Sequence, residues 1–458
     1  MIYYFLIKNF NKIIITVACV IIYSCENKNN INNHALKDSN FNYKEYKPKG
    51  NEIIISRSQY VDKLKGFWLG QCIANWTGLV TEMDKIGNIG ETKTGNFYTR
   101  EDWGKEDLPN IWGGKKDFSP IIDFVFEGED GTWGADDDTD IEYIYQHLLY
   151  TNKTSLLTGD QIRNGWLKHI KNDEENYLWV SNQRALDLMI EGEIPPETSN
   201  PLKNKEYEMI DAQLTTEIFG FFSPSRNDFA VKMAELPIRT TARENAEWIS
   251  KFYVSMYSLA AKTNPNISIK ENLLLMAEKS RNQLPKDSYS SKMYDFVKKQ
   301  YESNLPWETI RDNIYKRYQV EQKDGYNLTS KNIRCNACFA AGINFAASLV
   351  SLFCGEGDIK ETIKIGTLAG WDSDNPTATW GGLIGFMIGQ NEVEKAFERD
   401  FSEKFNIHRT RENFPNPVDS FSNMAKIGIF ITDRVVQEEL GGGIDLNKNI
   451  WYIPKNKN

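Results

Sequence analysis

Apolar residues recur at spacings of three and four along most of the chain from about residue 56, whereas strict alternation is short and rare. This spacing places apolar side chains on one face of an α-helix. The pattern is clearest in five segments: 61–80, 139–150, 246–261, 331–353 and 377–389. No internal repeat and no Pro/Ser-rich linker divides residues 56–458. We therefore predict an all-α fold, with 56–458 as a single large, helical bundle-like catalytic domain.

The first 24 residues have the pattern of a targeting segment. Lys8 and Lys12 precede an apolar run at 13–22 that only Thr16 interrupts. A run of this length is too short to span a bilayer comfortably. Residues 1–24 therefore predict a signal peptide.

A cysteine directly follows this segment. Cys25 stands behind the small residue Ser24, which resembles a bacterial lipobox, and predicts lipidation of Cys25. A plain signal peptide cut nearby and an uncleaved anchor are the alternatives. Residues 25–55 begin with a polar, Asn-rich stretch and are predicted to be a flexible tether. We expect an exported protein of the bacterial cell envelope, held at the membrane by the lipid anchor only.

Composition narrows the class of partner. The formal net charge is −9, and no stripe of Lys and Arg stands out. Phosphate neutralisation needs clustered basic side chains, so we expect no nucleic-acid partner. Cys335 and Cys338 form a CxxC pair, but with no second CxxC and no nearby His we predict two packed thiols on a helix rather than a redox or zinc site. An exported location leaves a disulfide open.

Residues 84–135 are the most irregular part of the chain, rich in Gly, Asp and Trp. A long loop in a compact domain usually serves a function, so this one is predicted to be a lid or a wall of a site. A surface excursion is the alternative.

Three acidic motifs are candidates for chemistry. In the first, Gly66, Gly70 and Ala74 recur every four residues, and Glu82 ends the small-residue face. Such a face lets another helix backbone approach closely. Alone, the motif is typical of tight packing.

The second motif places four carboxylates within five residues, at Asp136, Asp137, Asp138 and Asp140, directly before a helical segment. A helix dipole favours each negative charge near its N-terminus by about 0.3–1 kcal/mol, which hardly offsets all four. A bound cation would offset the rest. An N-cap with a solvated acidic turn is the alternative.

The third motif contains Asp372, Asp374 and Asn375, followed by Pro376 and a Gly-rich helical segment. Pro suits the first turn of a helix. Oxygen ligands of this kind favour Mg²⁺, Mn²⁺ or Ca²⁺ over zinc or copper. The four histidines lie in no HExxH or nucleophile-elbow context.

In this order, the three motifs resemble the ADP-ribosylglycohydrolase family over about residues 60–440. The segment that starts with Asp211-Ala-Gln213 also resembles the middle region of that family. The resemblance implies an all-α fold with a dinuclear site for two Mg²⁺ or Mn²⁺ ions. It implies that the metals orient a ribose and a water molecule, which attacks the anomeric carbon with help from a carboxylate.

Carried over by position, the resemblance assigns roles to named residues. The expected metal ligands are Glu82, Asp136, Asp137, Asp138, Asp372, Asp374 and Asn375. The residues expected to carry catalysis are Glu82, Asp137, Asp138 and Asp374. The expected substrate contacts are Asn75, Trp133, Gly134 and Trp371.

The sequence departs from the family pattern at several positions. Asp136 and Asn375 stand where the family has Thr, and Asn75 replaces an Asp. The middle region offers Thr240, Thr241 and Arg243 where the family often has a His. Metal binding should survive these changes, because each of the two turns keeps its oxygen ligands.

These features predict a metal-dependent hydrolase that cleaves an ADP-ribosyl or related ribosyl or nucleoside bond with a metal-positioned water. The partner is a small-molecule or ADP-ribosylated substrate, and the oligomeric state is open. Two alternatives remain: a hydrolase of another glycoside on the same fold, and a non-catalytic module that binds metal or nucleotide.

Overall fold

The computed structural model describes residues 35–114, 119–171, 176–331 and 333–455. The predicted signal peptide and Cys25 lie outside the described residues. The chain divides into two units, Met1–Lys37 and Asp38–Asn458, and the helices and strands described below belong to the second. Within the described part of the chain, no helix is both long and apolar enough to cross a membrane.

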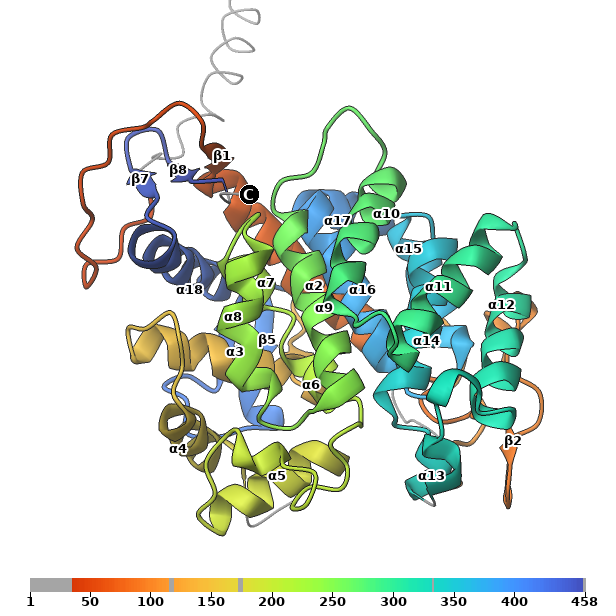
Figure 1. Cartoon of the computed structure of the whole chain (residues 1–458). Helices are drawn as coiled ribbons and strands as arrows, with labels where there is room; N and C mark the ends of the chain where they lie inside the picture. Colours follow the sequence, from red (N-terminus) through yellow and green to blue (C-terminus); the bar gives the residue numbers. More distant parts are fainter. Residues whose placement is uncertain (1–34, 115–118, 172–175, 332, 456–458) are drawn as a thin grey trace, which may run out of the picture. The chain divides into compact units, whose positions relative to one another are not determined.

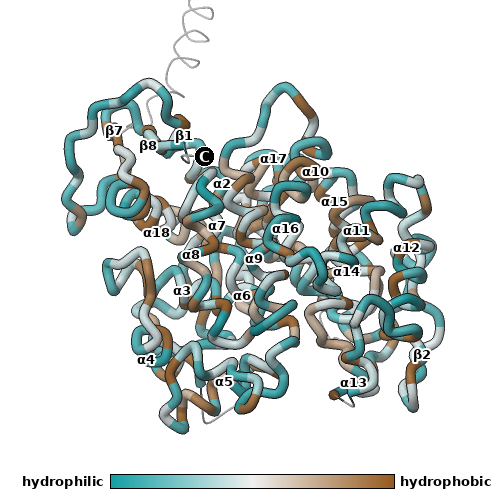
Figure 2. The backbone as a smooth tube through the Cα atoms, in the orientation of Figure 1, coloured by the Kyte–Doolittle hydropathy of each residue, from teal (hydrophilic) through white to brown (hydrophobic). Residues whose placement is uncertain are grey.

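The second unit is mostly helical, which confirms the all-α prediction (Figure 1). Six long helices build its core: α2 (Arg57–Gly78), α3 (Asp137–Thr151), α9 (Glu244–Ala260), α14 (Ala341–Cys354), α16 (Asp374–Ile388) and α18 (Phe421–Arg434). The other helices are α4 (Gly159–His169), α5 (Val180–Ile190), α6 (Asp211–Thr215), α7 (Phe219–Phe222), α8 (Asn227–Ile238), α10 (Ile269–Ser280), α11 (Tyr289–Glu302), α12 (Trp307–Ile314), α13 (Arg334–Ala337), α15 (Ile359–Ala369) and α17 (Gln390–Phe397). Hydrophobic positions recur along the inner helices, and hydrophilic positions predominate on the outer loops (Figure 2).

The strands are short, and some of them pair segments that are far apart in the sequence. They are β1 (Ile53–Ser56), β2 (Asn88–Ile89), β3 (Thr92–Lys93), β4 (Trp133–Gly134), β5 (Lys404–Asn406), β6 (Val418–Ser420), β7 (Gly443–Asp445) and β8 (Ile450–Ile453). The order β1-β8-β7 is antiparallel throughout. In the second three-stranded sheet, β4 pairs in parallel with β5, and β5 pairs with β6 in antiparallel fashion. The parallel pair holds the segment ahead of α3 in place.

Helices α2 and α16 pack against each other through their glycines. A Cβ atom at Gly66 would collide with the carbonyl oxygen of Gly385, and one at Gly70 with that of Gly381. Further along, a Cβ at Gly78 would lie 2.5 Å from the Cα of Asp374. The small-residue face of the first motif therefore brings the end of α2 against the start of α16, as the sequence predicts.

Residues 38–55 are not a flexible tether, so the predicted start of the domain at residue 56 is wrong. β1 pairs with β8 from Ile53 opposite Ile453 to Ser56 opposite Ile450. Ahead of it, Phe41 is buried and the Tyr43 hydroxyl donates a hydrogen bond to Asp433. The aromatic and apolar residues that follow the Asn-rich stretch find partners in the last helix and hairpin. The domain therefore begins at about Asp38.

We expect a chain that starts at residue 38 to fold fully and one that starts at residue 56 to be less stable. The shorter chain loses β1 and the buried Phe41 and Ile55. Burial of side chains of this size stabilises by about 1.5–3 kcal/mol each, so the melting temperature should fall by several degrees. Calorimetry of the two chains measures the difference. Equal melting temperatures would show that residues 38–55 contribute nothing to the fold.

The predicted helix at 331–353 begins later than its apolar pattern suggests. Cys335 and Asn336 adopt left-handed backbone angles, with φ of 44° and 57°, and α14 starts at Ala341. Within this turn Cys335 and Cys338 form a disulfide, with their Cα atoms 5.5 Å apart. The prediction of two thiols packed on a helix face is therefore wrong, because the segment turns where the pattern predicted a continuous helix.

Candidate functional site

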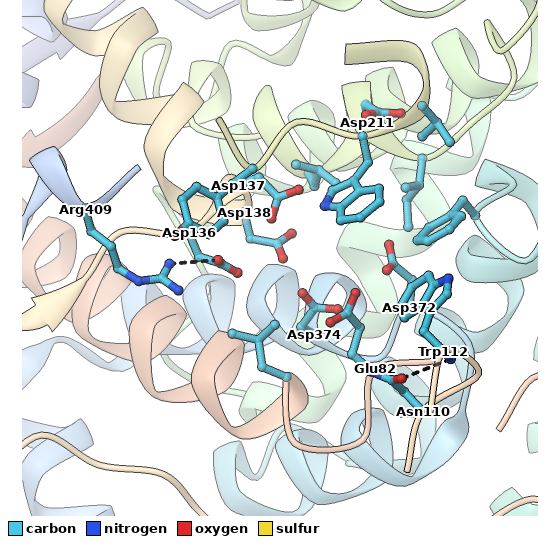
Figure 3. A pocket seen from close by; sticks show the side chains of 17 residues that line it. Glu82, Asn110, Trp112, Asp136, Asp137, Asp138, Asp211, Asp372, Asp374 and Arg409 are labelled. Atoms are coloured by element: carbon cyan, nitrogen blue, oxygen red, sulfur yellow. Dashed lines mark hydrogen bonds and ion pairs between the residues drawn. The ribbon is translucent and has the colours of Figure 1, made fainter. Parts of the chain in front are cut away.

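The three acidic motifs meet at one cavity of about 330 Å³ (Figure 3). This volume lies within the range of small-molecule sites. Six carboxylates of the motifs line it: Glu82, Asp136, Asp137, Asp138, Asp372 and Asp374. Glu82 and Asp374 are 292 positions apart in the sequence, and the α2–α16 packing brings the segments that carry them together.

The carboxylates form two groups with metal-ligand spacing. Asp136, Asp137, Asp138 and Asp374 each offer an oxygen within 4.8 Å of the others, and so do Glu82, Asp372 and Asp374. Asp374 belongs to both groups. The carboxylates thus form an acidic cluster that could hold metal.

The N-terminus of α3 explains why its acidic residues face different ways. Asp136 is the N-cap, and its backbone N–H donates to the Thr139 hydroxyl. Asp140 points away from the cavity and forms a fully buried ion pair with Arg411 at 2.9 Å. Three of the four carboxylates therefore remain for the cavity, while the protein itself neutralises the fourth.

The third motif is fixed to the end of α2. The Ser373 hydroxyl donates to the carbonyl oxygen of Gly78 at 2.9 Å, and the backbone N–H of Asp372 donates to the Asn344 side chain at 3.2 Å. Asp374 then starts α16. Its Oδ1 is buried and has no hydrogen-bond partner among the described residues. A buried carboxylate oxygen in this state is suited to a cation.

The carboxylates that line the cavity repel one another. Burial raises the pKa of Asp137, Asp138 and Asp374 well above the ordinary value, and the neighbouring carboxylates raise it further. Without a compensating charge these groups would hold protons. Oxygen-only donors, mutual repulsion and the unpartnered oxygen of Asp374 together fit divalent cations that prefer oxygen ligands.

Two asparagines hold Asp138 from either side. Asn75 Nδ2 donates to one carboxylate oxygen at 3.1 Å, and Asn375 Nδ2 donates to the other at 2.9 Å. The amide oxygen of Asn375 in turn accepts a hydrogen bond from Gln213 at 3.1 Å. Both asparagines are buried, and their amides orient Asp138; the roles predicted for Asn75 as a substrate contact and for Asn375 as a metal ligand stay predictions.

Asn375→Ala should lower both metal affinity and turnover by roughly 10–100-fold, the usual effect of losing a residue that orients a metal ligand. The change removes the donor to Asp138 and leaves Gln213 without its acceptor. Isothermal titration with Mn²⁺ and steady-state rates measure the two effects. Asn391→Ala, at an exposed position on α17, is the control. Unchanged Mn²⁺ affinity in Asn375→Ala would contradict the orienting role.

Three other predicted substrate contacts, Trp133, Gly134 and Trp371, lie next to the acidic turns but outside the cavity lining. Trp133 is fully buried and its indole N–H donates to the carbonyl of Ser402. Trp371 is also fully buried, and its indole donates to Gln319 at 2.8 Å. Gly134 accepts a hydrogen bond from Trp76. Their role as substrate contacts therefore stays a prediction.

The cavity has further lining residues that the motifs did not indicate. The aromatic side chains are Trp112, Tyr177, Trp179 and Phe339, and the charged ones are Asp211 and Arg409. The irregular segment was predicted to form a wall, and Trp112 confirms this. Asp211 lies in the Asp-Ala-Gln segment. Nothing in the local sequence distinguished Trp179, Phe339 or Arg409.

Arg409 closes the Asp136 end of the cavity. Its Nη1 donates to Asp136 at 3.2 Å, and its guanidinium lies over the rings of Trp76 and Tyr177, 4.9 and 5.0 Å from the ring centroids. Arg243, in the middle region without the family's His, donates instead to the carbonyl of Pro196, away from the cavity.

A helical domain that gathers carboxylates from three separate turns around one cavity defines a protein with an oxygen-ligand centre of the kind used in hydrolysis. The chain belongs to the ADP-ribosylglycohydrolase family, whose model matches residues 56–414. It is therefore a glycoside hydrolase, with its substrate left open.

Other comparisons add less. A solved structure titled "ADP-ribosylglycohydrolase-related protein complex" aligns with 82% of this chain and 99% of that chain, at 15% identity and a TM-score of 0.47. No curated protein matches the chain.

Proposed function

We propose that this protein hydrolyses a glycosidic bond with a water molecule activated by two divalent cations, Mg²⁺ or Mn²⁺. The observation that carries the proposal is the pair of carboxylate groups that share Asp374. Glu82, Asp372 and Asp374 would hold one cation, and Asp136, Asp137, Asp138 and Asp374 the other. Bound divalent cations supply Lewis acidity, which makes water a better nucleophile at neutral pH and stabilises developing charge.

Side chains of the protein would orient the catalytic carboxylates and accept and return protons. Asn75 and Asn375 hold Asp138 in one orientation, so it need not reorganise during the reaction. A carboxylate of the centre accepts the proton of the attacking water, and the departing group regains a proton as the glycosidic bond breaks.

The first candidate bond is an ADP-ribosyl bond, or a related ribosyl or nucleoside bond. Membership of the ADP-ribosylglycohydrolase family supports this choice. A second candidate, another glycoside, is favoured by the exposed aromatic side chains at the cavity, which suit a flat ring.

The test is hydrolysis by residues 38–458 with Mg²⁺ or Mn²⁺. Chromatography of an ADP-ribosylated peptide would follow released ADP-ribose, and a panel of nucleosides and glycosides would be followed by released reducing sugar. We expect activity that EDTA removes and Mn²⁺ restores. Asp137→Asn should be inactive. Hydrolysis that persists in EDTA would refute the cation-dependent mechanism.

We also propose that the protein is exported and anchored through a lipid on Cys25, on the basis of the basic and apolar pattern of residues 1–24. Cells that express the full chain should incorporate labelled palmitate into it. The variant Cys25→Ser should incorporate none and should leave the membrane fraction. Equal labelling of both would contradict the proposal.

A further inference from the structure

The CxxC motif lies in a turn that borders the acidic centre. Cys335 and Cys338 form a disulfide, and the next residue, Phe339, lines the cavity. We call residues 335–338 the disulfide turn. A bridge between residues three positions apart closes a very short loop, so it constrains the unfolded chain less than a bridge across a long loop does. Its contribution to stability is therefore small compared with that of a long-range disulfide.

Three consecutive residues of the disulfide turn have left-handed backbone angles. The φ angles are 44° at Cys335, 57° at Asn336 and 61° at Ala337. Residues with a side chain avoid this region and enter it mostly singly. The covalent bond between the two ends of the turn holds the backbone in this shape. Once that bond is broken, we expect the turn to relax toward right-handed or extended angles.

Two hydrogen bonds connect the disulfide turn to the acidic centre. Asn344 Nδ2 donates to the carbonyl oxygen of Cys338 at 2.9 Å, and Asn344 Oδ1 accepts the backbone N–H of Asp372 at 3.2 Å. The same Nδ2 donates to the carbonyl oxygen of Ala340 at 3.0 Å. Asn344 is fully buried, so solvent does not readily replace a partner that it loses. A shift of the Cys338 carbonyl therefore changes the position of the amide that holds Asp372.

The segment after the turn is fixed independently of the disulfide. The carbonyl oxygen of Phe339 accepts the backbone N–H of Ile210 at 2.9 Å, and the backbone N–H of Ala341 donates to the carbonyl oxygen of Glu208 at 3.0 Å. These bonds hold the start of α14 in both redox states. Loss of the disulfide should therefore move the disulfide turn and the Asn344 amide without unfolding the wall of the cavity.

The two cysteines differ in their access to solvent. Cys335 is half-buried, whereas Cys338 is fully buried. A thiolate from solution therefore attacks the sulfur of Cys335 and forms a mixed disulfide there, while Cys338 leaves as a thiolate and takes up a proton. The second thiol of a dithiol then displaces Cys335 as a thiol. In the whole step the dithiol gives up two electrons and two protons and becomes a disulfide.

We propose that the Cys335–Cys338 disulfide is a redox switch of the acidic centre, opened by exchange with a dithiol and closed by exchange with a disulfide. In the oxidised form the disulfide turn holds Asn344, and Asn344 holds Asp372. In the reduced form Asp372 is held less firmly, and metal affinity falls. The switch rests on the proposed function for its cation site at Asp372, but the redox change and its effect on the turn need no substrate. Asn344 is a positioning residue.

The test compares the oxidised and reduced forms of residues 38–458. Dithiothreitol serves as the dithiol and is removed in the absence of air before metal is added, and alkylation with mass spectrometry counts the free thiols. In the metal-free protein, reduction should speed hydrogen exchange at residues 335–344. Titration should show about tenfold weaker binding of Mn²⁺ by the reduced form, because a residue that orients a metal ligand is displaced. Oxidised glutathione should restore the original affinity.

Cysteine variants connect the effect to this disulfide. Cys335→Ser leaves the buried Cys338 thiol in place and should bind Mn²⁺ like the reduced form, with or without dithiothreitol. Cys354→Ser removes a cysteine that forms no disulfide, and its Mn²⁺ affinity should respond to reduction as that of the unaltered protein does. Loss of the redox response in Cys354→Ser would overturn the assignment to Cys335 and Cys338.

Two variants in α14 test the connection through Asn344. Asn344→Ala should weaken Mn²⁺ binding and make it insensitive to dithiothreitol, whereas Ser351→Ala, at another buried polar position of the helix, should keep the response. Reduction that lowers the melting temperature but leaves Mn²⁺ affinity unchanged would overturn the switch and show a purely structural bond. Redox-dependent Mn²⁺ binding without hydrolysis would support the switch and refute the proposed reaction, so the two proposals fail separately.

Discussion

Asp374→Asn should abolish hydrolysis, with kcat/KM lower by about a thousandfold or more, and should lose high-affinity binding of Mn²⁺. Asp374 is the residue that both carboxylate groups share, so under the proposed mechanism its loss weakens both proposed cation sites at once. The substitution keeps the size of the side chain. It should therefore not disturb the packing of α16 on α2.

The same substitution should have opposite effects on stability with and without metal. Without cations it removes a carboxyl group that burial and the charges of Glu82, Asp138 and Asp136 force to take up a proton, which costs folding free energy, so the variant should unfold at a higher temperature than the wild type. With saturating Mn²⁺ the wild type should be the more stable, because ligand at a hundredfold its dissociation constant adds about 2.7 kcal/mol.

Isothermal titration, steady-state kinetics and thermal unfolding measure these effects. Asp160→Asn, an exposed carboxylate in the first turn of α4, is the control and should resemble the wild type throughout. Wild-type Mn²⁺ affinity in Asp374→Asn would mean that the shared position of this residue has no role in binding.

The helical class and the acidic centre could be predicted because they follow from local patterns. Periodic apolar residues define α2, α3 and α16, and an acidic turn next to a helix start is visible in the sequence itself. The glycine spacing of α2 also indicates that another helix approaches it closely. Together these patterns identified six of the carboxylates that line the cavity, and Asp211 is the lining carboxylate that lies outside the three motifs.

The remaining site residues depend on tertiary contacts that no local pattern encodes. Asn375 has the right type for a ligand, but its oxygen is taken by Gln213, 162 positions away in the sequence. Trp133 and Trp371 adjoin the acidic turns in sequence, yet their indoles find buried acceptors. Trp179 and Phe339 meet at the cavity because α5 and α14 flank it. The helix predicted at 331–353 starts only at Ala341, because the turn closed by the Cys335–Cys338 disulfide interrupts it, and the apolar pattern does not reveal that turn.

Behind the centre, a buried pair of carboxyl groups should make stability depend on pH. Glu142 and Glu217 are both buried. Glu142 accepts hydrogen bonds from Gln71 and from the backbone N–H of Ile218, and Glu217 accepts one from Thr379. Burial raises the pKa of Glu217 from 4.5 to about 8, and burial together with Glu217 raises the pKa of Glu142.

The direction in which the free energy of unfolding changes with pH follows from the number of protons bound by the folded and unfolded chains. At pH between about 4.5 and 8 the folded pair holds a proton that the unfolded chain has released. The contribution of the pair to the free energy of unfolding is therefore fully present below about pH 4.5 and is lost as pH rises through this window, by about 1.4 kcal/mol per pH unit for each proton concerned. The loss should persist with saturating Mn²⁺, because the pair lies outside the two cation groups.

Glu217→Gln should flatten this part of the pH dependence, since it removes one charge of the pair and leaves an amide oxygen for the Thr379 hydroxyl. Urea unfolding at several pH values in saturating Mn²⁺ measures the slope. Glu235→Gln, at an exposed position on α8, should keep the wild-type slope. The buried pair would not be its source if Glu217→Gln lost stability with rising pH as steeply as the wild type. A flattened slope would show that the Glu142–Glu217 pair behind the acidic centre keeps a proton at neutral pH. The pair would then carry less negative charge towards Asp138 and its neighbours.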